Sequence, residues 1–218
     1  MDDTAATHGL ESSLDSLIAG VVVPGIRIAF RLIAVGDENA LLPDERPPFE
    51  ASVVRVRRAS GAARIAARNL LASFGHDLPS IPRGTAGKPI WPSGIVGSLT
   101  HDHHVAVAAI AQRDQYFGLG IDIEPVEALP EDLLPIVATP AERKRIGDAT
   151  IAGRVLFSAK EAVYKAVYPL DGLFLDHLDV EIDFGRSQGF VNNGRIVDLR
   201  FAVGERILTL AYLRAGLG

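Results

Sequence analysis

The chain has 218 residues, of which 48% are hydrophobic and 22% are charged, and its formal net charge is −5. This composition is typical of a folded globular protein and argues against a disordered tail or a coiled coil. The sequence contains no cysteine, which excludes disulfides, thiol catalysis and thiolate metal sites and leaves carboxylates and histidines as metal ligands. No apolar run approaches the roughly 20 residues that cross a bilayer, and the N-terminus lacks the basic region of a signal peptide, so we expect a cytoplasmic protein.

The first half of the sequence predicts one strand, one long helix and a loop. Apolar residues alternate with other residues over 26–32, which is typical of a half-buried strand. Over 50–74 they recur at helical spacing, which indicates an amphipathic helix that Gly75 caps. Residues 79–97 contain four prolines and four glycines, so a structured loop is expected there.

The second half predicts strands on both sides of a second helix. Residues 105–111 and 116–124 are expected to form a pair of adjacent strands. A helix is predicted over 154–168 and is expected to end at Pro169. Apolar and acidic residues then alternate over 178–184, and two later turn signals indicate an antiparallel meander.

Each half of the chain therefore contains a strand, a long helix and more strands. This order predicts an α+β fold and is compatible with two similar subdomains packed side by side, approximately residues 1–112 and 113–218. No low-complexity linker separates the halves, so residues 1–218 are expected to form one domain.

Two acids share one face of the predicted strand 116–124. Three apolar side chains alternate with them, which places Asp122 and Glu124 together on the other face. Side chains two residues apart on a strand lie roughly 7 Å apart at Cα, close enough for both carboxylates to reach one magnesium ion. A solvent-facing strand with two acids is the alternative interpretation.

The second helix carries Glu161 and Lys165, which are four residues apart and share a face. A surface ion pair between them is the simplest interpretation. If this face instead lines a site, Glu161 completes a three-carboxylate magnesium site and Lys165 neutralises a phosphate. Lys160 lies on the adjoining face and offers a second charge.

Hydroxyls and histidines precede the predicted strand 105–111. Ser98, Thr100 and a protonated His101 can donate hydrogen bonds to a phosphate, whereas turn-stabilising hydrogen bonds are the alternative. His103 and His104 also lie here, but adjacent histidines on an extended chain point in divergent directions, which argues against a zinc site. No role is predicted for these two residues.

Three arginines of the first helix, Arg57, Arg64 and Arg68, are expected to form a stripe opposite its apolar face. A solvated basic face is one interpretation of this stripe. A phosphate-rich ligand would instead use it through bidentate contacts. Arg83, in the proline-rich loop, would extend the row.

Three motifs, at residues 97–101, 120–124 and 157–161, occur together with Lys165. In order and spacing they resemble the motifs of Sfp-type 4'-phosphopantetheinyl transferases, in particular the enterobactin-associated and mycobacterial branch. The likeness extends over about residues 52–170. It implies the fold of that family, in which two similar α+β subdomains pack side by side with the site in the cleft between them.

The resemblance also implies roles for individual residues. The implied magnesium ligands are Asp122, Glu124 and Glu161. The side chains implied or assigned to contact coenzyme A are Arg57, Arg64, Arg83, Ser98, Thr100, His101, Lys160 and Lys165. Related enzymes carry a basic pair just before the arginine helix, where this chain has Arg55, Arg57 and Arg58. We assign Arg57 to this position and leave the choice among the three open.

The implied reaction is attack by a serine hydroxyl of an apo acyl or peptidyl carrier protein on the β-phosphorus of coenzyme A, with release of adenosine 3',5'-bisphosphate. Glu161 would accept the serine proton, and Lys165 would offset charge on the leaving group. The alternatives are a non-catalytic protein that binds coenzyme A or a nucleotide, and a magnesium-dependent hydrolase of nucleotide diphosphates. We further expect a monomer that binds neither nucleic acid nor membrane and that serves secondary-metabolite or siderophore biosynthesis.

Overall fold

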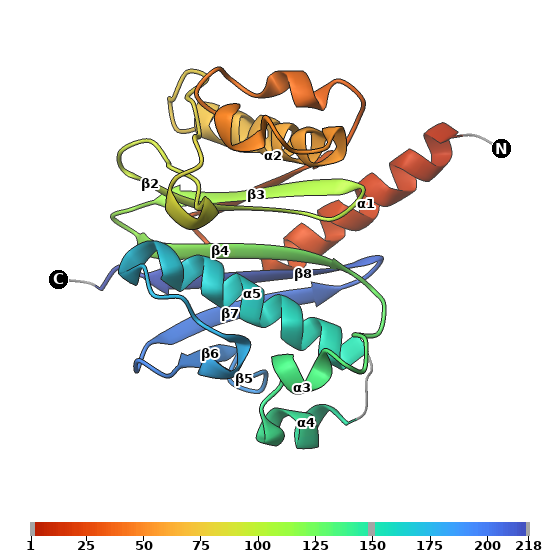
Figure 1. The fold of residues 1–218 in the computed structure, drawn as a ribbon, viewed down its shortest axis with the longest axis vertical. Coiled ribbons are helices and arrows are strands. Elements are labelled where there is room, and N and C mark those ends of the chain that lie inside the picture. The colour runs from red at the N-terminus through yellow and green to blue at the C-terminus, as the bar shows by residue number, and fades with distance from the viewer. Residues whose placement is uncertain (1–2, 148–150, 217–218) are drawn as a thin grey trace.

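The computed structural model describes residues 3–147 and 151–216. It contains two antiparallel sheets, a three-stranded sheet in the order β1-β3-β2 and a five-stranded sheet in the order β4-β8-β7-β6-β5. Helix α2 covers the outer side of the first sheet and α5 lies along β4 of the second (Figure 1). This arrangement confirms the predicted α+β fold. Among the described residues, no helix is both long enough and apolar enough to span a membrane.

The part of the chain that contains the first sheet has the following elements in order: α1 (Asp3–Val21), β1 (Ile26–Leu32), η1 (Asp37–Ala40), η2 (Pro47–Phe49), α2 (Val54–Ala72), η3 (Thr85–Gly87), β2 (Ile95–His101) and β3 (Val105–Gln112). The second sheet and its helices follow: β4 (Tyr116–Pro125), α3 (Leu134–Val137), α4 (Pro140–Ile146), α5 (Ile151–Asp171), η4 (His177–Asp179), β5 (Val180–Asp183), β6 (Gln188–Val191), β7 (Ile196–Val203) and β8 (Arg206–Arg214). The predicted strand at β1, the two long helices and the C-terminal meander are confirmed.

Helix α2 ends where the sequence indicates. Gly75 adopts a φ of 81°, a left-handed conformation that glycine enters without steric cost. Its N–H donates to the carbonyl of Ala72, and the N–H of His76 donates to the carbonyl of Leu71. These two bonds satisfy carbonyl groups that the last turn of a helix leaves unpaired.

The predicted pairing of residues 105–111 with 116–124 is wrong. Strand β3 pairs with β1 and β2, whereas β4 pairs with β8 in the other sheet. The reason is that β3 is buried on both faces. Ala108 and Ile110 pack with α2, while Val107 and Ala109 pack with residues of β4 and β8. The second sheet therefore lies against a face of β3 and not at its edge.

Two further predictions need correction. Residues 95–97, which were predicted to end the loop, instead begin strand β2, because the backbone of 95–101 pairs with β3 along its whole length. Pro169 lies inside α5 and does not end it. In the last turn a proline removes few of the hydrogen bonds that hold the helix, so the helix continues to Asp171.

Helix α1 lies outside the predicted elements and joins the two sheets. Leu14, Leu17 and Val21 belong to the same buried cluster as apolar residues of β3, β4 and β8. The helix thus belongs to the N-terminal part of the sequence but packs against the C-terminal sheet (Figure 1).

Candidate active site

Asp122 and Lys165 meet where β4 lies along α5. Asp122 is 4% exposed, and its Oδ1 accepts a hydrogen bond from Lys165 Nζ at 2.6 Å. Thr100 of β2 donates to the same oxygen at 3.2 Å, and Lys165 Nζ also lies 3.3 Å from Thr100 Oγ1. Strands β2 and β4 and helix α5 are therefore in direct contact through Thr100, Asp122 and Lys165.

Glu161 does not pair with Lys165, so the interpretation of these two residues as a surface ion pair is wrong. Glu161 Oε1 lies 3.0 Å from Nε2 of His177. The His177 ring stacks on Phe157 with 5.4 Å between ring centroids. The hydrogen bond from His177 lowers the pKa of Glu161 below its usual value, with burial opposing it. His177 lies beyond the predicted helix, and no motif singled it out.

Glu124 lies two residues after Asp122 on strand β4 and pairs with an arginine. It accepts a hydrogen bond from Arg154 at 3.1 Å. Burial raises its pKa to about 7, and the neighbouring charge of Asp122 adds to this rise. Burial likewise raises the pKa of Asp122, while Lys165 opposes the rise and Glu161 adds to it. The three carboxylates therefore influence one another electrostatically, as neighbouring like charges do.

The donor chemistry of this group fits a hard cation. Asp122 Oδ2 is buried and has no hydrogen-bond partner among the residues described, an arrangement that costs free energy unless something satisfies the oxygen. Carboxylate oxygens are the ligands that magnesium prefers. Within residues 3–147 and 151–216, however, no three histidines or carboxylates surround one metal position. Lys165, Arg154 and His177 each hold one of the three acids instead.

Two of the assigned residues are already engaged within the protein. Lys160 is 1% exposed, and its Nζ donates to Glu142 at 2.7 Å and to the carbonyl of His177 at 2.8 Å. This contradicts the expectation of a free charge beside Lys165. Ser98 is buried, and its Oγ accepts from the N–H of Ile121 at 3.1 Å, so it joins β2 to β4.

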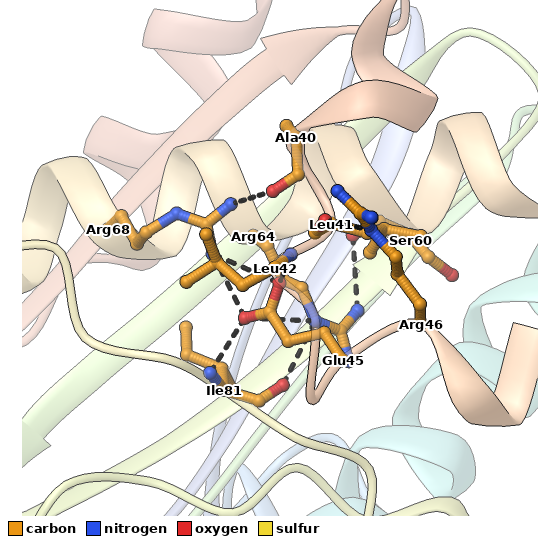
Figure 2. Close-up of polar contacts among 9 residues, drawn as sticks. All are labelled: Ala40, Leu41, Leu42, Glu45, Arg46, Ser60, Arg64, Arg68 and Ile81. Atoms are coloured by element: carbon orange, nitrogen blue, oxygen red, sulfur yellow. Dashed lines mark hydrogen bonds and ion pairs between the residues drawn. The ribbon is translucent and has the colours of Figure 1, made fainter.

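The arginines of α2 do not form an exposed row, and this prediction is wrong. Arg64 and Arg68 are 3% and 7% exposed, and both approach the buried carboxylate of Glu45 (Figure 2). Arg57 donates to the carbonyl of Ser52 at 2.8 Å. Glu45, in the loop before the helix, is the counter-charge that draws the arginines inward, and no periodic pattern revealed it.

Arg55 and Arg58, at the start of α2, also have different partners from each other. Arg55 is exposed and lies 3.4 Å from the His103 ring, whereas Arg58 pairs with Glu38 at 2.9 Å. Arg55, His103 and His104 line a cavity of about 520 Å³ that also reaches His101 and Glu124.

Four of the assigned residues line one cavity of about 240 Å³: Arg64, Arg83, Thr100 and His101. Among the residues described, its lining includes none of the three carboxylates. The guanidinium carbons of Arg64 and Arg83 lie 5.2 and 5.4 Å from the centroid of the same Phe49 ring. Burial lowers the pKa of His101, so the arginines supply most of the positive charge here at neutral pH.

A second cavity of about 240 Å³ lies between β2, β4 and α5. Its walls include Trp91, Leu99 and Tyr164, and they extend to Glu161 and Lys165. The indole N–H of Trp91 is buried without a partner among the described residues. A cavity that combines apolar walls with charged groups such as Lys88 and Arg113 suits an elongated organic substituent that carries polar groups.

Comparison with known proteins relates both parts of the chain to one family. Residues 44–111 match the 4'-phosphopantetheinyl transferase N-terminal domain, and residues 118–208 match the 4'-phosphopantetheinyl transferase superfamily. The two matches meet between β3 and β4, where the chain passes from the first sheet to the second.

Three relatives agree with this assignment. The chain is 36% identical to 4'-phosphopantetheinyl transferase Npt of Nocardia iowensis over 82% of its own length and 81% of the relative. It is 39% identical to 4'-phosphopantetheinyl transferase PptT of Mycobacterium tuberculosis over 66% and 65% of the two chains. It is 34% identical to enterobactin synthase component D of Escherichia coli K12 over 53% and 57%. The chain belongs to the 4'-phosphopantetheinyl transferase family, enzymes that transfer phosphopantetheine from coenzyme A to carrier proteins.

Proposed function

We propose that this chain transfers the 4'-phosphopantetheine group of coenzyme A to a serine of an apo acyl or peptidyl carrier protein, with release of adenosine 3',5'-bisphosphate and with dependence on magnesium. The observation that carries the proposal is the contact of Asp122, Lys165 and Thr100 at the junction of two cavities. The cavity lined by Arg64, Arg83 and His101, called the basic cavity below, suits a nucleotide phosphate. The cavity between β2, β4 and α5 suits a pantetheine arm.

The proposed reaction divides its tasks among the residues at this junction. The serine oxygen forms a bond to the β-phosphorus, and the bond from that phosphorus to the bridging oxygen of the diphosphate breaks. Glu161 accepts the serine proton, directly or through water. Lys165 offsets the charge that develops on the leaving phosphate. Both residues lie on one face of α5, which fixes their separation.

Asp122, Glu124 and Glu161 are the residues proposed to hold magnesium. When bound, the ion would supply charge stabilisation to the diphosphate oxygens. The unpartnered Asp122 Oδ2 supports this assignment. For Glu124 and Glu161 to join it, their carboxylates must exchange Arg154 and His177 for the ion. We therefore expect small rotations of these two side chains on binding.

The basic cavity is proposed to receive the 3'-phosphate of coenzyme A. The diphosphate is the reacting group, so it has to lie beside Lys165 and the carboxylates. Arg64, Arg83 and His101 line a cavity whose described walls contain no carboxylate of that group, and they suit the other phosphate of the molecule. Arg57, Ser98 and Lys160 are engaged within the protein and are proposed to act through structure.

The proposal is tested by incubating the chain with coenzyme A, magnesium and a panel of apo carriers and measuring the mass of each carrier. Transfer adds one phosphopantetheine group to a carrier. Release of adenosine 3',5'-bisphosphate without a carrier would indicate the hydrolase, and binding without either product would indicate the non-catalytic alternative. Asp122→Asn should abolish transfer, whereas Asp171→Asn removes an exposed acid paired with Arg195 and should leave transfer unchanged.

The biological setting of this activity is also a proposal. A siderophore or other secondary-metabolite carrier is supported by the similarity to enterobactin synthase component D. The monomeric state, the cytoplasmic location and the lack of nucleic-acid or membrane binding stay predictions from the sequence. Sedimentation of the purified chain would test the first of these.

A further inference from the structure

Glu45 is a buried carboxylate that connects three segments of the first half. It has 0% of its surface exposed. Its Oε1 accepts from the N–H of Ile81 at 2.7 Å and from Arg68 Nη1 at 2.9 Å. Its Oε2 accepts from the N–H of Leu42 at 2.8 Å. Figure 2 shows the carboxylate at the centre of these contacts. The loop 41–46, helix α2 and the Ile81 segment therefore depend on one side chain.

Arg64 and Glu45 both hydrogen-bond to the backbone of Ile81. Its Nε donates to the carbonyl of Ile81 at 3.0 Å, and its Nη1 donates to the carbonyl of Ser60 at 3.1 Å. Glu45 thus fixes the N–H of Ile81 while Arg64 uses the C=O of Ile81 (Figure 2). A shift of the Ile81 backbone would turn the guanidinium plane of Arg64, which lines the basic cavity.

Glu45 also has a charge effect, and it acts in the opposite direction. Its Oε1 lies 3.6 Å from Arg64 Nε, so it weakens the attraction of Arg64 for an anion. Two buried guanidinium groups against one carboxylate still leave positive charge beside the cavity. Burial lowers the pKa of Arg64, the charge of Glu45 opposes this decrease, and Arg68 and Arg83 add to it. The two effects therefore predict opposite results when Glu45 is replaced. Loss of the orienting contact should weaken anion binding by Arg64, whereas loss of the negative charge should strengthen it.

We propose that Glu45 is a positioning residue that orients Arg64 toward the 3'-phosphate of coenzyme A, and so sets the preference for coenzyme A over 3'-dephospho-coenzyme A. The inference rests on the proposed function of the basic cavity. Neither Glu45 nor Arg68 lines that cavity, so Glu45 acts through Ile81 and Arg64. A misoriented donor loses much of the strength of a charge-assisted hydrogen bond.

The test is calorimetry of both ligands with the unmodified protein and with Glu45→Gln. Coenzyme A should bind the variant about tenfold more weakly. Glutamine offers one acceptor oxygen in place of the two that hold the N–H groups of Ile81 and Leu42, so the Ile81 backbone shifts and Arg64 loses its orientation before the ligand binds. The affinity for 3'-dephospho-coenzyme A should stay within about twofold, since this ligand lacks the phosphate in question. Tighter binding of coenzyme A by the variant would mean that Glu45 only reduces the local positive charge, and would overturn the proposal.

A second variant covers the case in which Glu45→Gln does not fold. Glu45→Gln leaves two buried guanidinium groups without a counter-charge, which is strongly destabilising. The double variant Glu45→Gln/Arg68→Gln removes one charge of each sign, so the net charge beside the cavity is unchanged. It should show the same selective loss of coenzyme A affinity, and this loss cannot come from charge.

Asp37→Asn is the matched control. Asp37 is also a buried acid of the first half, at 3% exposed, and it pairs with Arg31 away from the basic cavity. It should lower stability and leave the preference between the two ligands unchanged. If the unmodified protein itself shows no preference, both the phosphate cavity and the role of Glu45 are refuted. If it shows a preference that the Glu45 variants retain, only the role of Glu45 is refuted.

Discussion

Glu161 faces two partners in the proposed cycle, His177 in the structure described and the magnesium ion during transfer. Replacing it by glutamine keeps the size of the side chain and its ability to hydrogen-bond to His177. Coenzyme A affinity should fall by no more than about tenfold, or roughly 1.4 kcal/mol, because arginines and Lys165 hold the phosphates. Carrier modification should fall by on the order of a hundredfold or more, since both a base and a metal ligand are lost.

The two quantities are measured on one preparation, by calorimetry with coenzyme A and by mass spectrometry of an apo carrier. Glu181→Gln is the control, because Glu181 is an exposed acid that pairs with Arg145 on the surface. Near-normal carrier modification by Glu161→Gln would remove Glu161 from the proposed chemistry.

Glu124 is predicted to make stability depend on pH in the direction opposite to that of an ion-paired surface acid. Its pKa is raised to about 7 from an ordinary 4.5, so between these values the folded state holds a proton that the unfolded state has released. Stability should therefore fall as pH rises through this window and level off above pH 7. Glu124 is partly exposed, and solvent screens part of the effect, so relative to Glu124→Gln the unmodified protein should lose no more than about 2 kcal/mol.

Urea unfolding of both proteins at pH 5 and pH 8 gives this difference, and the contributions of titrating groups that do not interact with Glu124 cancel between the two proteins. An equal pH dependence for the two would contradict the raised pKa. Magnesium should reduce the loss at pH 8, because it favours the ionised carboxylate.

The sequence predicted the acidic and basic residues of the junction but not their partners. Asp122, Glu124, Glu161 and Lys165 lie at spacings that strand and helix geometry turn into shared faces. His177 begins the short 3-10 helix η4 and Glu45 lies in a turn, and their partners are 16 and 23 residues away along the chain. No short-range pattern records such a contact. The inward turn of Arg64 and Arg68 was missed for the same reason, because periodicity alone assigns charged residues to the exposed face.

Helices and strands were predicted correctly where one local sequence pattern determines the secondary structure. Strand β1, helices α2 and α5 and the C-terminal meander each show a regular period or a turn signal. The pairing of β3 with β4 was wrong because sequence proximity favours a hairpin, whereas the two buried faces of β3 require separate layers. Strand β2 was missed because prolines and glycines precede it and polar residues occupy it.

The approach of β4 to α5 depends on Gly120. A Cβ at this position would overlap the backbone carbonyl of Ala162. Gly120→Ala should therefore force the helix away from the strand, with a cost of about 1–3 kcal/mol, and should separate Glu161 and Lys165 from Asp122. We expect a lower melting temperature together with a loss of transfer that is larger than the loss of folded protein.

Gly9→Ala is the control, since a Cβ there would meet nothing within 4 Å, and the change should alter stability by no more than about 1 kcal/mol in either direction. Thermal unfolding and carrier modification are compared for both variants. Normal activity of Gly120→Ala would show that the β4–α5 spacing is not critical.

The whole molecule is predicted to unfold as one cooperative unit. Leu17 of α1 packs with residues of both sheets, so neither half keeps a complete core without the other. Fluorescence of Trp91, the one tryptophan of the chain, should change at the same denaturant concentration as the far-ultraviolet circular dichroism. Leu17→Ala should move both transitions together and cost about 2–5 kcal/mol.

Two separate transitions would contradict this expectation and would indicate that the halves 1–112 and 113–218 are independent. Leu17→Ala also tests to which half α1 belongs. If only one of two transitions moved, α1 would belong to that half alone.

Strand β8 is formed late in the chain, yet it lies between β4 and β7 and covers the same core as α1. During synthesis, the first helix must therefore wait for almost the whole polypeptide before its apolar face is covered. A message that stops before residue 206 would yield a product with β4 unpaired and α1 exposed. Such a product is a substrate for chaperones and proteases, so we expect premature termination to leave no accumulated fragment in the cell.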